Sequence, residues 1–470
     1  MDQSSTAGVA TNSSSSLSTT HAPDASRSSD IECIEENVII DEITEAEPTS
    51  VTLRFCKRKF LLPYVVFLAT AGLRPRYSDF VFLGYWVGHL KTFLMLLMLI
   101  IGYILQFMCG YRRDHGVIEP IQWSTTSTVA PEPNWTFRDQ AVPAGSGPGH
   151  LGLLASGEAM FIYLIPALLH LNGFVLAVFI YRFADNEQLQ NLVERVFILS
   201  AKPRRLVMTL WLYIGLGLVW FALSSAYSLG TLYVDAVSVV ERFSSFRWTS
   251  GLAQWPRTAF VLSWALTTTL MCHDFVQMVV IVSYSLLCYL LRCYLKALKE
   301  KLLLHTIEPL NWMREICEFR KLLHHLNTKI SLPVASLTVL NLSYAVSGVA
   351  HLFRDMTACP INIFTANLAN ILLWLVIALM PFFQAASLTV TCRQTQSCGH
   401  LISIRPFVHR NTSSEDLNTV LLYASSLKMS AKLFRMPVSA HYLCFLVLVC
   451  FIGVLTFGMC LNISLGGGRL

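Results

Sequence analysis

Charged residues are scarce in this chain. Of its 470 residues, 14% are Asp, Glu, Lys or Arg, whereas 54% are hydrophobic. A soluble domain carries roughly 25% charged residues, so this composition argues against an ordinary soluble protein. Most of the surface is expected to face lipid, which makes the bilayer the first partner, and no nucleic-acid partner is expected.

Motifs for enzyme or metal chemistry are also missing. The sequence has no glycine-rich phosphate loop, no nucleophile elbow and no histidine pair on one helical face. The 13 cysteines are scattered singly, and Cys392 and Cys398 have neither zinc-ligand nor redox spacing. We therefore expect no enzymatic activity, no catalytic residues, no metal site and no cofactor.

The first 53 residues contain no apolar run. They are rich in Ser and Thr and then acidic from Asp30 to Glu47. This composition predicts a disordered tail over 1–53 and no cleavable signal peptide. An internal helix would then be the first segment to enter the membrane.

Seven apolar runs reach the roughly 20 residues that a transmembrane helix needs. They cover 88–109, 159–181, 207–233, 258–288, 333–353, 362–390 and 440–463. The sequence therefore predicts an all-α membrane protein whose seven-helix domain spans 88–463, followed by a short C-terminus, 464–470. Before it, residues 54–87 hold a shorter run, Phe60–Leu73, flanked by basic residues, which is typical of an interfacial helix.

Basic residues fall mainly on one side of these runs. With the N-terminus in the cytosol, 27 of the 35 Lys and Arg are cytosolic and 8 are not. This asymmetry predicts a cytosolic N-terminus and a C-terminus outside. The long segment 110–158 would then also lie outside, where Asn134 in Asn134-Trp135-Thr136 is a candidate glycosylation site.

Three segments predict helices that continue past the membrane. The fourth run is followed by a basic helical stretch, and Trp312–Lys329 places apolar residues three and four apart ahead of the fifth run. Ser414 begins a second amphipathic run that leads through 436 to Pro437 and the last span. We expect helices 4 to 6 to extend into a cytosolic anchor region.

Ionisable residues at membrane depth are the main candidates for a site, because burying charge in lipid is costly. His273 and Asp274 lie near the middle of the fourth run and His170 in the second, while Asn172 and Gln384 are weaker candidates. These residues either line a ligand cavity or ion route, or form a polar cluster satisfied by neighbouring helices. Small and polar residues near the end of the last run allow either close helix packing or a pore lining.

Three stretches resemble the arthropod gustatory receptor family, which belongs to the insect chemoreceptor superfamily of ligand-gated cation channels. The first is Phe60–Pro75, where the family has a short helix ending in a Gly-Leu-x-Pro turn. The second is Phe319–Ile330, which enters the fifth span. The third is the amphipathic run from Ser414 together with the last span that follows it. In that span Thr456-Phe457 occupies the place of the family's Thr-Tyr. The family's Gln-Phe falls at Ile463-Ser464, or one residue earlier at Asn462.

The resemblance implies a divergent chemosensory receptor of the plasma membrane. It would assemble as a homo- or heterotetramer, bind a small-molecule tastant among helices 2 to 6 and open a pore lined by helix 7. Thr456, Phe457 and Asn462 carry over to the pore. His170, His273 and Asp274 remain candidate ligand-binding residues from their polarity and depth.

Two other classes have comparable hydropathy. A G-protein-coupled receptor also has seven spans, but it needs the opposite orientation. A transporter or membrane-embedded enzyme would use His273 and Asp274 for proton transfer. Transporters commonly consist of two related halves, and this sequence shows no convincing internal repeat.

Overall fold

The structure is a computed structural model that describes residues 48–75, 82–114, 160–184, 188–200, 202–234, 239–240, 242–243, 257–304, 306–355, 361–397, 414–434, 436–439 and 441. The chain divides into two units, residues 1–51 and 52–470. Residues 48–51 are the described part of the first unit. All other described residues belong to the second.

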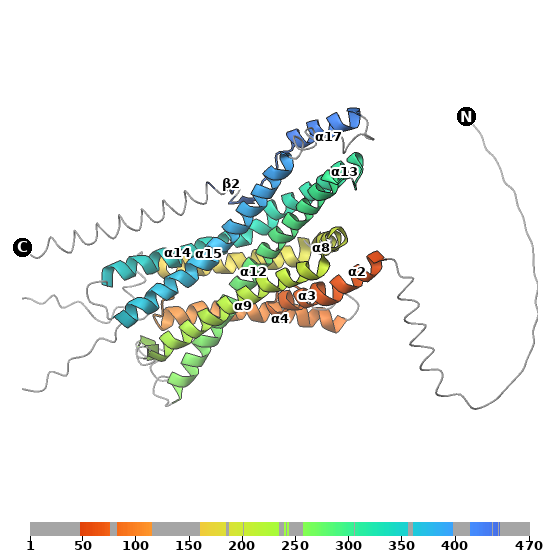
Figure 1. The fold of residues 1–470 in the computed structure, drawn as a ribbon. Helices are drawn as coiled ribbons and strands as arrows, with labels where there is room; N and C mark the ends of the chain where they lie inside the picture. The colour runs from red at the N-terminus through yellow and green to blue at the C-terminus, as the bar shows by residue number, and fades with distance from the viewer. Residues whose placement is uncertain are drawn as a thin grey trace, which may run out of the picture. The chain divides into compact units, whose positions relative to one another are not determined.

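The described part of the second unit is helical almost throughout (Figure 1). Its long helices are α4 (Phe82–Met108), α7 (Ile165–Phe179), α9 (Pro203–Val234), α12 (Thr258–Leu303), α14 (Ser331–Asp355) and α15 (Ile361–Gln396). The shorter helices are α2 (Pro48–Cys56), whose residues 48–51 belong to the first unit, α3 (Leu62–Thr70), α8 (Gln188–Leu199), α13 (Pro309–His325) and α17 (Ser414–Ser426). Four π-helical segments extend them: η1 (Lys57–Leu61), η2 (Met160–Leu164), η3 (Ile180–Ala184) and η4 (Leu326–Ile330). Strands β1 (Lys432–Leu433) and β2 (Met436–Pro437) pair antiparallel.

Within the residues that the structure describes, six helical segments are long and apolar enough to cross a membrane. They are Trp86–Met108, Ile162–Phe183, Pro203–Val234, Phe260–Leu303, Leu310–Leu352 and Phe364–Gln396. Each contains most of one of the first six predicted runs, so the chain is a multi-pass, all-α membrane protein. The seventh predicted run, 440–463, lies almost entirely outside the described residues, and the number seven and the orientation stay predictions.

Helix α12 is the central helix of the bundle. In its most apolar window 83% of the residues are buried, against 22% in α4. It packs against α4, α8, α9, α13, α14 and α15. A helix that is apolar all round needs neighbours on every side. Helices α4 and α9 instead expose large apolar side chains such as Leu90, Phe93 and Leu212, as lipid-facing helices do.

A glycine turn fixes how α3 meets α4. Gly72 has a φ of +75°, and the backbone N–H of Leu73 donates to the Leu68 carbonyl at 3.1 Å, which closes the end of α3. A Cβ at Gly72 would lie 3.2 Å from the Cα of Thr92, whose hydroxyl donates to the Gly72 carbonyl at 2.6 Å. The turn therefore needs glycine for its backbone angle and for the close approach of α4.

The predicted extensions of the fourth, fifth and sixth helices are present. Helix α12 continues to Leu303, and α13, η4 and α14 form one continuous helical segment over 309–355. Helix α15 runs to Gln396. These lengths exceed the roughly 20 residues that cross a bilayer. The cytosolic location of the extensions is a matter of orientation and stays a prediction.

The predicted helix over 414–436 is wrong beyond Ser426. There α17 ends, and the β1–β2 hairpin follows, with Phe434 at a φ of 55°. Side chains of other helices supply the backbone partners that a helix would have provided: Asn327 Oδ1 accepts from the Lys432 N–H at 2.7 Å, and Thr389 Oγ1 accepts from the Ala431 N–H at 3.1 Å. Periodicity of apolar residues cannot reveal such distant partners.

Candidate functional site

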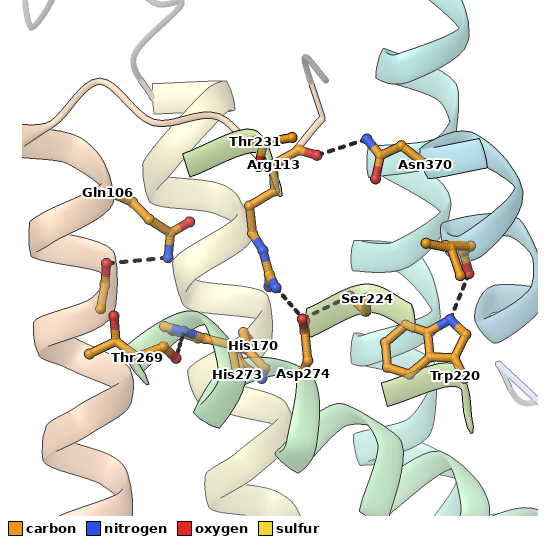
Figure 2. A network of polar contacts seen from close by, with 12 residues as sticks. Gln106, Arg113, His170, Trp220, Ser224, Thr231, Thr269, His273, Asp274 and Asn370 are labelled. Atoms are coloured by element: carbon orange, nitrogen blue, oxygen red, sulfur yellow. Dashed lines mark hydrogen bonds and ion pairs between the residues drawn. The ribbon is translucent and has the colours of Figure 1, made fainter. Parts of the chain in front are cut away.

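A buried ion pair joins Arg113, just after α4, to Asp274 of α12 (Figure 2). Their side chains are 2% and 0% exposed. The second carboxylate oxygen of Asp274 accepts a hydrogen bond from Ser224 of α9 at 2.8 Å. The Arg113 guanidinium lies 5.0 Å from the centre of the Trp374 ring, and Asn370 donates to the Arg113 carbonyl at 3.1 Å. These contacts connect the end of α4 to α9, α12 and α15.

The charge of Arg113 is stabilised by its partner. Burial alone lowers the pKa of the guanidinium, but the Asp274 carboxylate raises that pKa, and the net shift is upward from its ordinary value. Arg113 therefore stays protonated. The site holds a permanent buried cation, which is stable there only while a carboxylate faces it.

His273 bridges α12 and α4. Its Nδ1 lies 2.7 Å from the Thr269 carbonyl oxygen, and its Nε2 lies 3.1 Å from the Leu99 carbonyl oxygen. A neutral imidazole donates to one of these carbonyls, whereas the protonated ring donates to both. The ring fits because α4 has a glycine opposite it: a Cβ at Gly102 would lie 2.2 Å from His273 Cε1.

His170 of α7 completes an aromatic group with His273 and Tyr103. The Tyr103 hydroxyl lies 3.0 Å from His170 Nδ1, and the two histidine ring centres are 5.0 Å apart. The Tyr103 ring meets the His273 ring edge to face at 4.5 Å. All three side chains are buried. We call Arg113, Asp274, Ser224, His273, His170 and Tyr103 the polar cluster.

Several buried polar atoms in and beside the polar cluster have no hydrogen-bond partner among the described residues. They are Nη1 of Arg113, Nε2 of His170 and both amide atoms of Gln277, one turn along α12 from His273. Each buried polar group without a partner costs about 1–3 kcal/mol. Such atoms offer hydrogen bonds to the polar groups of a ligand or to water.

An open apolar groove of about 580 Å³ lies between α9, α12 and α15, within the size range of small-molecule sites. Its lining includes Trp220 and Tyr227, and Tyr227 has a buried hydroxyl with no hydrogen-bond partner in the described part of the chain. The centre of the Trp220 ring lies 6.1 Å from the centre of the Trp374 ring, and the Arg113 guanidinium lies over the Trp374 ring. Trp220, in the wall of the groove, therefore reaches the ion pair through one intervening side chain, Trp374.

A second ion pair lies next to Arg113 in the chain. Arg112 contacts Asp114 at 2.9 Å and His351 of α14 at 3.1 Å, and the Ser347 hydroxyl donates to Asp114 at 2.5 Å. Burial raises the pKa of the Asp114 carboxyl. Its hydrogen bonds with Arg112 and Ser347 lower the pKa by more than burial raises it, so that the pKa lies below its ordinary value. Asp114 is therefore ionised at neutral pH and holds the end of α4 against α14.

The structure brings the three predicted ligand-binding residues together. His170 and His273 are in ring contact, and Asp274 follows His273 in the same helix. Asp274 has protein partners in Arg113 and Ser224, which matches the alternative of a polar cluster satisfied by neighbouring helices. Ligand binding by these residues stays a prediction. The predicted pore residues Thr456, Phe457 and Asn462 and the glycosylation site Asn134 lie outside the described residues.

The two weaker candidates are not part of the polar cluster. Asn172 is exposed, with its amide nitrogen 3.4 Å from the Ser336 hydroxyl. Gln384 exchanges hydrogen bonds with Tyr213. Each side chain makes its hydrogen bond with a residue of a neighbouring helix.

Sequence reasoning missed the central residue of the cluster, Arg113. It entered the prediction only as one of the basic residues outside. The available signal was the run Arg112-Arg113-Asp114 directly after an apolar helix. Ser224 and Trp374 gave no signal, because serine and tryptophan are ordinary residues in apolar helices.

Comparison with known proteins assigns no family. No protein-family model matches the chain, and a search of curated proteins finds no relative. Across the residues that the structure describes, no group of three His, Cys, Asp or Glu side chains is placed to hold a metal ion. A functional conclusion therefore depends on the polar cluster and on the sequence patterns.

Proposed function

We propose that this chain is a gustatory-type chemosensory receptor that acts as a ligand-gated cation channel in the plasma membrane. The observation that carries the proposal is the convergence of His170, His273, Asp274 and Arg113 inside an apolar helix bundle. Ionisable groups at this depth are costly and by default mark function. In the proposed orientation the polar cluster lies toward the outside, where a tastant arrives.

The arrangement suggests how a ligand acts. A small molecule in the groove between α9, α12 and α15 contacts Trp220, and Trp220 neighbours the Trp374 ring under Arg113. A ligand shifts a conformational equilibrium only by as much as it binds the two states differently. We propose that the position of Arg113 relative to Asp274 differs between the closed and open states, so that occupancy biases the gate.

The pore in this proposal is formed by the last span. Four subunits, identical or mixed, would place Thr456, Phe457 and Asn462 around a central axis. The partial match to the family signature at these positions supports this assignment. The small and polar residues of this stretch are of the kind that line aqueous pores.

Whole-cell recording tests the proposal. Cells expressing the full chain are exposed to a panel of sugars, alkaloids and fatty acids, with untransfected cells as the control. We expect at least one compound to evoke a cation current that rises with concentration and saturates. Surface-expressed protein that gives no current with any compound, alone or with co-expressed receptor subunits, would contradict the proposal.

His170→Phe is expected to weaken the response to an active ligand. The substitution keeps an aromatic ring but removes both ring nitrogens, including the unpartnered Nε2. Loss of one hydrogen bond to a ligand is worth about 0.5–1.5 kcal/mol, or roughly 2- to 12-fold in half-maximal concentration. Asn172→Ala, on the exposed side of the same helix, is the matched control and should leave the response unchanged. Equal responses from both variants at equal surface expression would exclude His170 from the ligand site.

Orientation separates this proposal from a G-protein-coupled receptor. An epitope tag before residue 1 should be inaccessible to antibody on intact cells and accessible after permeabilisation. Asn134→Gln should increase gel mobility by removing one glycan, because the proposal places 110–158 outside. A tag that is labelled on intact cells would reverse the topology and rule out the channel.

Proton-coupled transport is the second candidate, and the buried Arg113–Asp274 pair beside His273 is the observation that favours it. Intramembrane carboxylates and histidines are typical of proton relays. Substrate uptake that acidifies the cytosol and is lost in Asp274→Asn, without a saturating channel current, would favour the transporter.

A further inference from the structure

A basic cleft lies at the other end of the bundle, between α13 and the segment that follows α17. Its volume is about 510 Å³. Its walls come from α13, η4 and residues 428–432, which are Cys317, Arg320, Lys321, Leu323, His324, Asn327, Lys428, Met429, Ser430 and Lys432. The cleft is far along the chain from the polar cluster and shares no residue with it.

The cleft carries an excess of positive charge. Arg320, Lys321, Lys428 and Lys432 are all exposed. Glu318 pairs with Lys321 at 2.7 Å and offsets one of the four charges. Three net positive charges therefore face one concave surface. Concave basic surfaces focus the electrostatic field and attract anions.

The wall that carries the lysines is held in place by three polar contacts, of which one is buried, one half-buried and one exposed. Asn327 donates to the Ser430 carbonyl at 3.0 Å and accepts from the Lys432 N–H at 2.7 Å. Thr389 of α15 accepts from the Ala431 N–H at 3.1 Å. The positions of Lys428 and Lys432 are thus set by η4 and α15. A preorganised binding wall loses little entropy when a ligand binds.

The cleft lies where a helix enters the apolar part of the bundle. Helix α13 leads through η4 directly into α14, and Asn327 precedes the predicted fifth span by six residues, or about 9 Å of helix. The headgroup layer is about 5–8 Å thick on each side of a bilayer, so the Asn327 end of the cleft lies at its outer edge, and Arg320, seven residues earlier in the chain, lies on the aqueous side of it. The lysine-bearing wall, in turn, precedes the apolar run 440–463.

We propose that this cleft binds the headgroup of a phospholipid that carries two or more phosphate groups in the cytosolic leaflet. Clusters of four or more Lys and Arg at the cytosolic end of a transmembrane helix are typical of such recognition. Phosphate oxygens match Arg and Lys donors through charge-assisted hydrogen bonds. The proposal rests on the proposed orientation of the chain but not on channel activity.

Occupancy would connect two parts of the chain. The headgroup would contact Arg320 on α13 and Lys428 and Lys432 in the segment before the last apolar run. If the proposed function holds, the lipid would stabilise one position of the last span relative to α13. Lipid binding is measurable without any current, so failure of this proposal and failure of the channel proposal are distinguishable.

Binding of a fluorescent phosphatidylinositol bisphosphate to the purified full chain in detergent tests the cleft. We expect saturable binding that weakens as salt rises. The triple variant Arg320→Gln, Lys428→Gln and Lys432→Gln should bind about 100-fold more weakly, from about fivefold for each cation. The matched control is Lys57→Gln, Arg58→Gln and Lys59→Gln, which removes the same charge from the exposed side chains of η1 and should retain binding.

Three results would overturn the proposal. Equal losses of lipid affinity in the two triple variants would show that the lipid is attracted by the overall positive charge of this surface and not by the cleft. Equal affinity for phosphatidylserine would show that the cleft does not recognise multiple phosphates. A soluble inositol polyphosphate that binds the cleft more tightly than the lipid would identify a free phosphate compound as the ligand. Unchanged thermal unfolding of the cleft variant shows that lost binding is not lost folding.

Discussion

Asp274→Ala is expected to lower the free energy of unfolding by about 3–5 kcal/mol, because it leaves the Arg113 guanidinium buried without a counter-charge. Arg113 is 2% exposed and cannot reach solvent without moving off the Trp374 ring. The loss also frees the Ser224 hydroxyl, which donates to Asp274. The measurement is the thermal unfolding midpoint of the purified full chain in detergent.

The double variant Arg113→Met, Asp274→Leu tests whether the loss of stability in Asp274→Ala comes from the unpaired charge or from lost side-chain packing. Replacing a whole buried pair by apolar residues of similar volume is often neutral or stabilising. We therefore expect the double variant to unfold at a higher temperature than Asp274→Ala. The proposed receptor would at the same time lose its ligand response, because the gate would lack the contact that occupancy changes.

An exposed pair provides the control for this experiment. Glu318→Ala removes the partner of Lys321, whose side chain is 73% exposed. Surface ion pairs contribute about 0–1 kcal/mol. A midpoint for Asp274→Ala as high as that of Glu318→Ala would show that the buried pair does not stabilise the bundle.

Gly102→Ala is expected to destabilise the protein by about 1–3 kcal/mol through overpacking. The new methyl group would lie 2.2 Å from His273 Cε1 and 2.9 Å from Thr269 Cβ. His273 has little freedom to move away, because both its nitrogens face backbone carbonyls of two helices. Thermal unfolding and the separation of α4 from α12, followed by a spin-label pair, would report the change.

Gly215→Ala is the matched control, since nothing lies within 4 Å of a Cβ at that position of α9. There alanine should be neutral or stabilise the helix by about 0.5–1 kcal/mol. The variant Gly102→Ala, His273→Ala should recover part of the lost stability, because the smaller side chain makes room for the methyl group. Equal effects of alanine at the two glycines would mean that α4 does not approach His273 closely.

The spans show how far local patterns reach. The run predicted at 207–233 corresponds to α9 at 203–234, and the run at 362–390 to the apolar part of α15. Hydrophobicity adds up residue by residue along one segment, so neighbours elsewhere in the chain are not needed to predict a span. The residues after Ser426 failed the same kind of prediction, since Asn327 and Thr389 satisfy their backbone from other helices.

Three residues of the candidate site were predictable from the sequence, but their arrangement in space was not. The cost of burying charge in an apolar run was enough to select His170, His273 and Asp274. Their mutual arrangement was not predictable, because the rotation of α7 and α12 about their axes decides whether two rings meet. Arg113 lies 161 residues from Asp274 in the chain, and in the sequence it resembles any loop arginine.

The sequence alone therefore determined that the chain is a helical, multi-pass membrane protein, because composition and run length measure the cost of contact with water and lipid directly. It also supplied the prediction of a cytosolic N-terminus, since basic residues are counted segment by segment. Only the tertiary structure decided that Arg113 neutralises Asp274, that Gly102 makes room for His273, and that Arg320, Lys428 and Lys432 share one cleft. Each of these depends on distances between separate helices, and packing sets those distances.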